Sequence, residues 1–131
     1  MGSSASAVTD KVQERASGAS RPVYRYDVPR KLAKISGIEK VGLVQLTPDE
    51  ELMGTKRARN DQARLAFEWA KQSLVEVNGK PVSLADGTSD KAWNDMHPKV
   101  RGLVVVAYGE LHTPEEDEIT DFLGSQTTTI G

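Results

Sequence analysis

The segment from Pro98 to Leu111 constrains the fold most, because it holds the densest run of apolar residues in the chain. Its apolar side chains recur at three- and four-residue steps, the period of one helix face: Val100, Leu103, Val104, Ala107 and Leu111. Valines at 105 and 106 and a tyrosine at 108 widen this face until most sides are apolar. A strand through Leu103–Tyr108 is the alternative, since β-branched residues favour sheets. The periodicity begins before the valines, so we predict a buried helix.

A β-hairpin is predicted at residues 74–84. Asn78-Gly79 separates the apolar segments Leu74–Val77 and Pro81–Leu84, and both turn residues tolerate positive φ. Two shorter extended pieces are predicted over 23–28 and 41–46. A two-stranded hairpin is not stable alone, so it must lie on a helix or on another strand. We therefore predict a mainly α fold of the α+β class.

Two similar helix N-termini are predicted, one on each side of the hairpin in the sequence. Thr47-Pro48-Asp49-Glu50 combines an N-cap, a proline at the first helical position and a capping box. It predicts one helix running to about Leu74, with its basic N-terminal half beyond the core and its C-terminal half facing the core. One side of this helix is formed by Leu52, Arg59, Ala63, Ala66, Phe67, Ala70 and Leu74. The same signal at Thr113 predicts a helix from Pro114 to Leu123, with Ile119, Phe122 and Leu123 facing inward. A short helix is also expected around Ala92–Met96.

The length of 131 residues fits one domain. We expect a disordered Ser/Ala-rich leader over 1–21, a compact helical domain over 22–124 and a tail over 125–131. Four aromatic residues are expected as core anchors, namely Trp69, Trp93, Tyr108 and Phe122.

Charge is distributed unevenly although the formal net charge is only -2. Residues 1–34 hold seven basic and three acidic side chains, and residues 35–108 hold ten of each. The remaining residues hold six acids and no lysine or arginine. This pattern is typical of a solvated surface, or of complementary ends that meet within one molecule or head-to-tail between molecules.

The residues needed for common catalytic chemistries are sparse. The chain has no cysteine, and its two histidines, His97 and His112, stand at predicted helix boundaries. Asp86, Asp90 and Asp95 lack the glycine and terminal glutamate of a calcium loop, so turn and capping roles are expected. Neither a phosphate-binding glycine loop nor a serine nucleophile elbow is present. We therefore predict a protein that is not an enzyme and that uses no cofactor or metal.

The candidate partner-binding residues are charged and lie on two predicted helices: Lys56, Arg57, Arg59, Arg64, Glu115, Glu116 and Glu118. The alternative is that these are solvated faces only. Basic residues also contact phosphates, but no zinc motif or helix-turn-helix spacing supports nucleic-acid binding. We expect protein partners, and nucleic acid is less favoured. The complementary charged ends would allow self-association.

Several short sequence motifs occur in a characteristic order along the chain: Thr47–Leu52 with Lys56–Ala58, Val77–Val82, Trp93–Arg101, Ala107-Tyr108 and Phe122–Ser125. In this layout the chain, from about residue 30 to 131, resembles small tail assembly chaperones of long-tailed bacteriophages. The resemblance implies a helical adaptor of the host cytoplasm that binds the tape-measure protein and helps recruit tail-tube subunits. It transfers no binding residue, because that family has no sharp motif.

Two other functions remain open from the sequence. A structural virion component, such as a tail or connector subunit, would suit the tail Thr127–Ile130 as an added strand. A small nucleic-acid-binding regulator would use the basic residues. We expect no membrane association, since the longest apolar run, Leu103–Tyr108, is far too short to span a bilayer.

Overall fold

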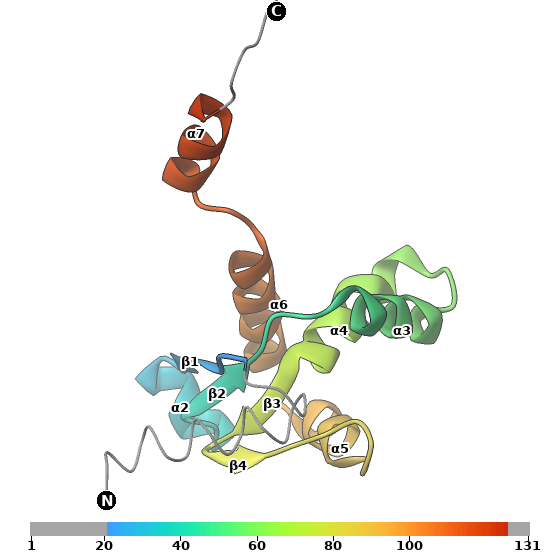
Figure 1. Ribbon diagram of the computed structural model, residues 1–131. Helices are drawn as coiled ribbons and strands as arrows, with labels where there is room; N and C mark the ends of the chain where they lie inside the picture. The colour runs from blue at the N-terminus through green and yellow to red at the C-terminus, as the bar shows by residue number, and fades with distance from the viewer. Residues whose placement is uncertain (1–20, 126–131) are drawn as a thin grey trace, which may run out of the picture.

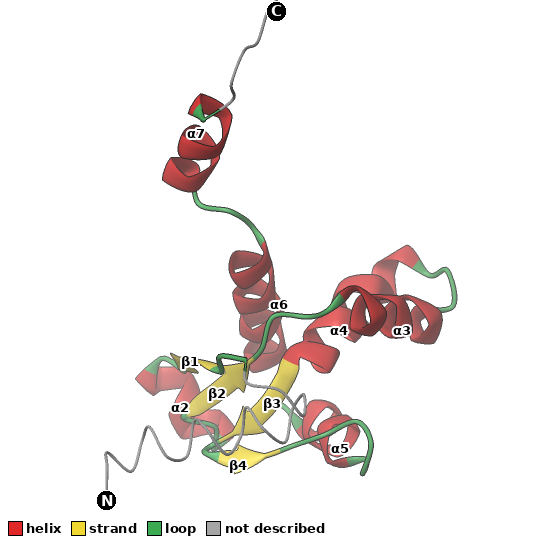
Figure 2. Ribbon diagram, in the orientation of Figure 1, coloured by secondary structure: helices red, strands yellow, loops and turns green. Residues whose placement is uncertain are grey.

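The computed structural model describes residues 21–125. A four-stranded sheet carries helices between and after its strands, which confirms the predicted α+β class (Figures 1 and 2). In chain order the elements are β1 Tyr24–Asp27, α2 Arg30–Ser36, β2 Lys40–Leu43, α3 Pro48–Ala58, α4 Gln62–Ser73, β3 Leu74–Val77, β4 Lys80–Pro81, α5 Thr88–Asp95, α6 Pro98–His112 and α7 Glu116–Gly124.

The sheet is antiparallel throughout, in the order β1-β2-β3-β4. The predicted hairpin forms its last two strands, and Asn78 and Gly79 have φ of 52° and 79°, as the Asn-Gly turn requires. The Asn78 side chain also accepts the Glu39 N–H at 2.7 Å and donates to the Gly37 carbonyl at 2.9 Å. The turn is thereby fastened to the start of β2.

The predicted helix at 98–111 is confirmed as α6, which supplies much of the main core. Its predicted burial is only partly correct, because Leu103 and Val106 are exposed. Val100 and Val104 are fully buried and cluster with Val41 and Leu43 of β2. Burying side chains of this size contributes about 1.5–3 kcal/mol each. The periodicity therefore outweighed the strand preference of the valines, because the helix can bury one face on the sheet and against α4.

The opposite face of the sheet carries an ion pair that spans three strands. Arg25 in β1 and Glu76 in β3 lie in one cross-strand row with Gly42 of β2 between them. The Arg25 Nε lies 2.7 Å from Glu76 Oε1, and Nη2 lies 3.1 Å from Oε2. Glu76 is only 1% exposed, so this contact neutralises a buried carboxylate and raises the pKa of Arg25. Gly42 leaves the space through which the arginine reaches across β2.

The prediction of one helix from 47 to 74 is wrong, because the chain reverses between α3 and α4. Arg59 and Asn60 adopt left-handed conformations, with φ of 53° and 63°. Asp61 then caps α4 by accepting the Ala63 N–H at 3.0 Å. Asparagine tolerates this conformation and aspartate favours the cap, so the basic segment folds back and the two helices lie side by side (Figure 1).

The predicted buried side of this region is correct only near its end. Ala70 and Leu74 are buried, whereas Ala63, Ala66 and Phe67 of the half predicted to face the core are exposed. The break at Arg59 changes which residues share a face. The short helix α2 was not predicted; it follows Pro29 and ends at Gly37, whose φ of 76° provides a left-handed C-cap.

The last helix also differs from the prediction. It begins at Glu116, because Glu115 rather than Thr113 occupies the N-cap and forms a capping box with Glu118. Its apolar residues do not face inward: Ile119, Phe122 and Leu123 are 43%, 75% and 61% exposed. The helix stands beyond the end of α6, out of reach of the core (Figure 1). Phe122 is therefore not a core anchor.

The other aromatic predictions agree with the structure. Trp93 and Tyr108 are buried in the main core, and Trp69 is half-buried against it. The leader and most of the tail, residues 1–20 and 126–131, lie outside the described residues. Between residues 21 and 125 no helix is both long and apolar enough to cross a membrane.

Replacing Gly42 with alanine should destabilise the protein. The added Cβ would lie 2.9 Å from the Cβ of Glu76 and 3.0 Å from Cγ1 of Val23, and the Glu76 Cβ cannot rotate away. We expect a loss of about 1–3 kcal/mol of unfolding free energy in urea titrations, as for other overpacked sites.

The control is Gly102→Ala in α6, where an added Cβ meets no atom within 4 Å. This substitution should be neutral or stabilising by up to about 1 kcal/mol, since alanine favours helix. Equal effects of the two substitutions would contradict the role assigned to Gly42.

Candidate functional site

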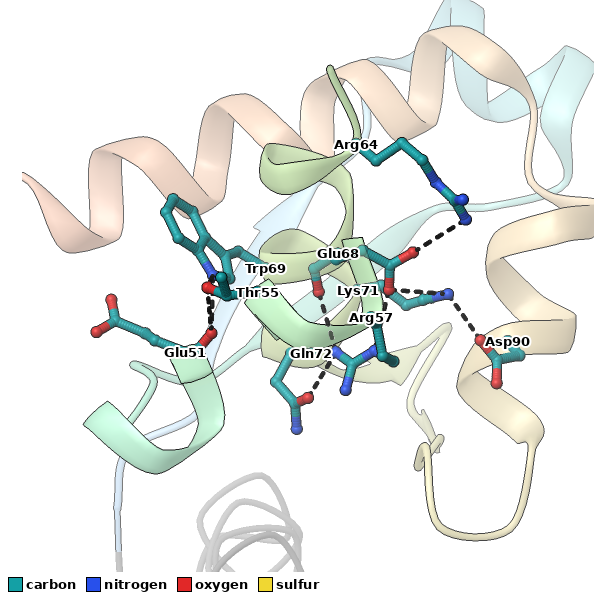
Figure 3. Close-up of polar contacts among 9 residues, drawn as sticks. All are labelled: Glu51, Thr55, Arg57, Arg64, Glu68, Trp69, Lys71, Gln72 and Asp90. Carbon is teal, nitrogen blue, oxygen red and sulfur yellow. Dashed lines mark hydrogen bonds and ion pairs between the residues drawn. The ribbon is translucent and has the colours of Figure 1, made fainter. Parts of the chain in front are cut away.

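The candidate site lies on the helical hairpin formed by α3 and α4. α3 begins with a complete capping box, in which Thr47 accepts the Glu50 N–H and the Glu50 side chain accepts the Thr47 N–H. The hairpin closes on Trp69, whose Nε1 donates to the Glu51 carbonyl at 3.0 Å and approaches Thr55 Oγ1 at 3.3 Å (Figure 3). Gly54 permits this approach, because a Cβ there would lie 2.7 Å from the indole ring. These contacts fix the position of α4 relative to α3.

Glu68 is the central acid of the hairpin and is only 6% exposed. Its Oε1 lies 3.0 Å from Arg57 Nε and 3.4 Å from Lys71 Nζ, while Oε2 lies 3.8 Å from an Arg64 nitrogen (Figure 3). Arg57 also donates to Gln72 Oε1 at 2.7 Å. One buried carboxylate therefore organises three cations from two helices.

Lys71 extends this cluster to a third helix. Its Nζ lies 2.8 Å from Oδ1 of Asp90 in α5, in addition to its contact with Glu68. The Lys71 side chain is 12% exposed, so its charge is largely shielded by these two acids. The hairpin is thereby anchored to α5 as well as to the sheet.

These contacts shape an open depression that we call the basic hollow. Its lining is formed by five cations around the one acid: Lys56, Arg57, Arg59, Arg64, Lys71 and Glu68. Lys56 and Arg59 are exposed. Because the cations exceed the acid, the hollow presents a positive field suited to carboxylates or phosphates on a partner.

The structure places the predicted site residues in two separate groups. Lys56, Arg57, Arg59 and Arg64 gather at the basic hollow, although the helix expected to carry them is broken. Glu115, Glu116 and Glu118 lie exposed in the first turn of α7, which stands away from the hairpin (Figure 1). The two groups do not contact each other within the described chain.

Sequence reasoning missed Lys71 and Glu68 as members of the site. Their spacing offered a signal, since Arg64, Glu68 and Lys71 follow one another at i,i+4 and i,i+3 positions on one helix. The contact of Arg57 with Glu68 could not be read in this way, because it depends on the chain reversal at Arg59.

Both histidines make structural hydrogen bonds at helix ends, as their positions suggested. His97 Nδ1 accepts the Lys99 N–H at 3.1 Å and caps α6. His112 Nε2 accepts the Leu46 N–H at 2.8 Å, and its Nδ1 lies 2.9 Å from the Tyr108 carbonyl. Within residues 21–125 no group of three or more histidine or acidic side chains is arranged to hold a metal ion.

Comparisons with protein-family models, with curated proteins and with solved structures found no match to this chain. The functional argument therefore depends on the residues and their geometry.

Replacing Glu68 with glutamine should lower stability while leaving the basic hollow more positive. Arg57, Arg64 and Lys71 would lose their shared carboxylate, so we expect a loss of about 1–3 kcal/mol of unfolding free energy. Urea titration measures this loss, and added salt should reduce it by screening the three cations. The matched control is Glu39→Gln, an exposed acid before β2, which should change stability by less than about 0.5 kcal/mol. A stability equal to that of the unchanged protein would contradict the central role of Glu68.

Proposed function

We propose that this protein is a non-enzymatic assembly chaperone for the tail of a long-tailed bacteriophage. In this role it acts in the host cytoplasm, binds the tape-measure protein and helps recruit tail-tube subunits. The resemblance in sequence layout supports the choice of family. The observation that carries a protein-binding role is the basic hollow, where exposed cations are held on a braced helical hairpin.

The chemistry of the basic hollow suits acidic segments of a protein client. Lys56 and Arg59 are exposed and show no ion pair within the described residues, so they can pair with carboxylates without breaking the fold. Arg57 and Arg64 add to the positive electrostatic potential of the basic hollow while they stay paired with Glu68. Such pairing would guide encounter and orientation more than it would add affinity.

Apolar contacts would supply affinity. Ile119, Phe122 and Leu123 of α7 are exposed, and an amphipathic helix of this kind binds apolar grooves or helices. A chaperone for helical, aggregation-prone clients needs such surfaces in place of a nucleophile. The proposed function thus uses the two groups of charged residues together with the apolar side of α7.

The decisive experiment is co-expression with the tape-measure protein encoded in the same genome. The unchanged protein should keep that client in the soluble fraction. Lys56→Glu with Arg59→Glu should weaken the complex about tenfold, which corresponds to about 1.4 kcal/mol. Both side chains are exposed, so thermal unfolding should be unchanged.

The matched control reverses two exposed lysines elsewhere, Lys80→Glu with Lys99→Glu. It changes the net charge equally and should leave the complex intact. A client that stays insoluble with the unchanged protein would contradict the chaperone function. Equal losses with both double variants would contradict the assignment to the basic hollow.

The projecting α7 also favours one second candidate, a permanent tail or connector subunit that uses this helix as a lattice contact (Figure 1). Mass spectrometry of purified particles distinguishes the two functions. A chaperone should be nearly missing from particles, whereas a subunit should be present in stoichiometric amount. Salt-sensitive binding to DNA with no effect on the client would instead indicate a nucleic-acid-binding regulator.

A further inference from the structure

The apolar side of α7 is not covered by the rest of the same molecule in this structure. Phe122 and Leu123 are 75% and 61% exposed, and every residue from Glu115 to Ser125 is exposed. A nine-residue helix without tertiary contacts is marginal in water, because helices of this length depend on packing of an apolar side. The remaining surface of α7 is acidic, with Glu115, Glu116, Asp117, Glu118 and Asp121.

An apolar groove of matching character lies between α6 and the end of β1. We call it the α6 groove; Val106 and Leu103 form its exposed side and are 66% and 37% exposed. The rest of its lining includes Tyr26, Val28 and Pro29. Its volume of about 260 Å³ lies below the range of about 300–1,000 Å³ typical of small-molecule sites. It therefore suits one or two apolar side chains of a helix better than a substrate.

The charges beside the α6 groove favour an acidic occupant. A second hollow shares Asp27 and Val28 with the groove and is lined by basic side chains of α2 and β2, namely Arg30, Lys34 and Lys40. Glu39 also lies in this second hollow, and Glu110 lines the groove itself. Asp27 is a second acid of this hollow, so its three cations exceed its two acids by one. The acidic first turn of α7 fits at this α2 end, away from Glu110.

The linker before α7 argues against docking of α7 on its own α6. Thr113 and Glu115 are both extended, with φ and ψ of -111° and 126° and of -75° and 161°. Pro114 favours the extended form of Thr113, and the capping box of α7 depends on the extended form of Glu115. Docking on its own α6 would require the chain to reverse within residues 113–115, so the backbone of this linker would have to change. Docking on another molecule leaves the linker as it is.

We infer that α7 of one molecule docks in the α6 groove of a second copy of this chain. Phe122 and Leu123 enter the groove, and the acids of the first turn of α7 face Arg30, Lys34 and Lys40 of that copy. Donor and acceptor surfaces differ, so the contact is head-to-tail and repeats along a chain of molecules or closes into a ring.

The size of the contact predicts weak association. A helix of nine residues covers less area than the roughly 1,200–2,000 Å² of a stable complex. Assembly should therefore increase with concentration, and an array of copies along a long client would promote it. The inference does not depend on the proposed function, because its test contains no client.

The test mixes two variants that each lack one half of the contact. Val106→Asp spoils the α6 groove but keeps α7, whereas Phe122→Ser spoils α7 but keeps the groove. In analytical ultracentrifugation the unchanged protein should show a mass that rises with concentration above the 14.3 kDa of one chain. Each variant alone should remain monomeric, and an equal mixture should reach twice that mass and no more. Both side chains are exposed, so circular dichroism should show unchanged folding.

Met53→Asp is the matched control, since Met53 is exposed on α3 and lines neither the α6 groove nor the second hollow. It should assemble as the unchanged protein does. Monomers at all concentrations of the unchanged protein would overturn the inference and favour a groove reserved for a client or for the molecule's own α7. A mixture of the two variants that stays monomeric, while the unchanged protein assembles, would also overturn it.

Discussion

The rest of the structure depends on the ion pair that crosses the sheet from Arg25 to Glu76. These residues belong to the first and third strands, and the contact passes over Gly42 in the strand between them. Glu76 is buried and the Arg25 side chain is 27% exposed, so removing the arginine would cost about 1–3 kcal/mol, because the buried carboxylate would lose this partner. The pair thus fixes three strands that come from distant parts of the chain. The other face of the same sheet is then free to bury the apolar residues of β2 against α6.

Two peripheral units, the α3–α4 hairpin and α7, carry exposed surfaces that are separate from the core. The α3–α4 hairpin is braced by Trp69 and by the buried Glu68, so its exposed cations lie on a defined scaffold. α7 lies beyond α6 and carries an acidic and an apolar surface. The acids that follow residue 109 are concentrated on α7, whereas the basic hollow belongs to the charge-balanced segment 35–108. The two charged surfaces are therefore spatially separate, which suits contacts between molecules.

The sequence predicted those parts of the fold that local chemistry determines. The Asn78-Gly79 turn and the helix at 98–112 follow from turn preference and apolar period, and both are present. The reversal at Arg59 was missed because a good helix start at Thr47 masked a weaker cap at Asp61. The inward face expected for Phe122 was wrong for a different reason: amphipathicity shows that a helix has an apolar side, but not which surface covers it.

The candidate site was predictable in its residues but not in its arrangement. Lys56, Arg57, Arg59 and Arg64 were recognised as a basic group, and the chain reversal brings them around one hollow. The buried role of Glu68 depends on a contact between two helices, which no pattern on one helix reveals. The α6 groove likewise requires β1 to lie beside α6, a long-range pairing that the sequence does not specify.

The central claim is that α7 serves contacts between molecules and is not part of the core. Amide hydrogen exchange of the unchanged protein, measured at low and high concentration, tests it most directly. We predict rapid exchange of Ile119–Leu123 in dilute solution and marked protection at high concentration, with the amides of α6 around Val104 protected throughout. Protection of α7 that is strong and independent of concentration would contradict the claim, because it would place this helix against its own body.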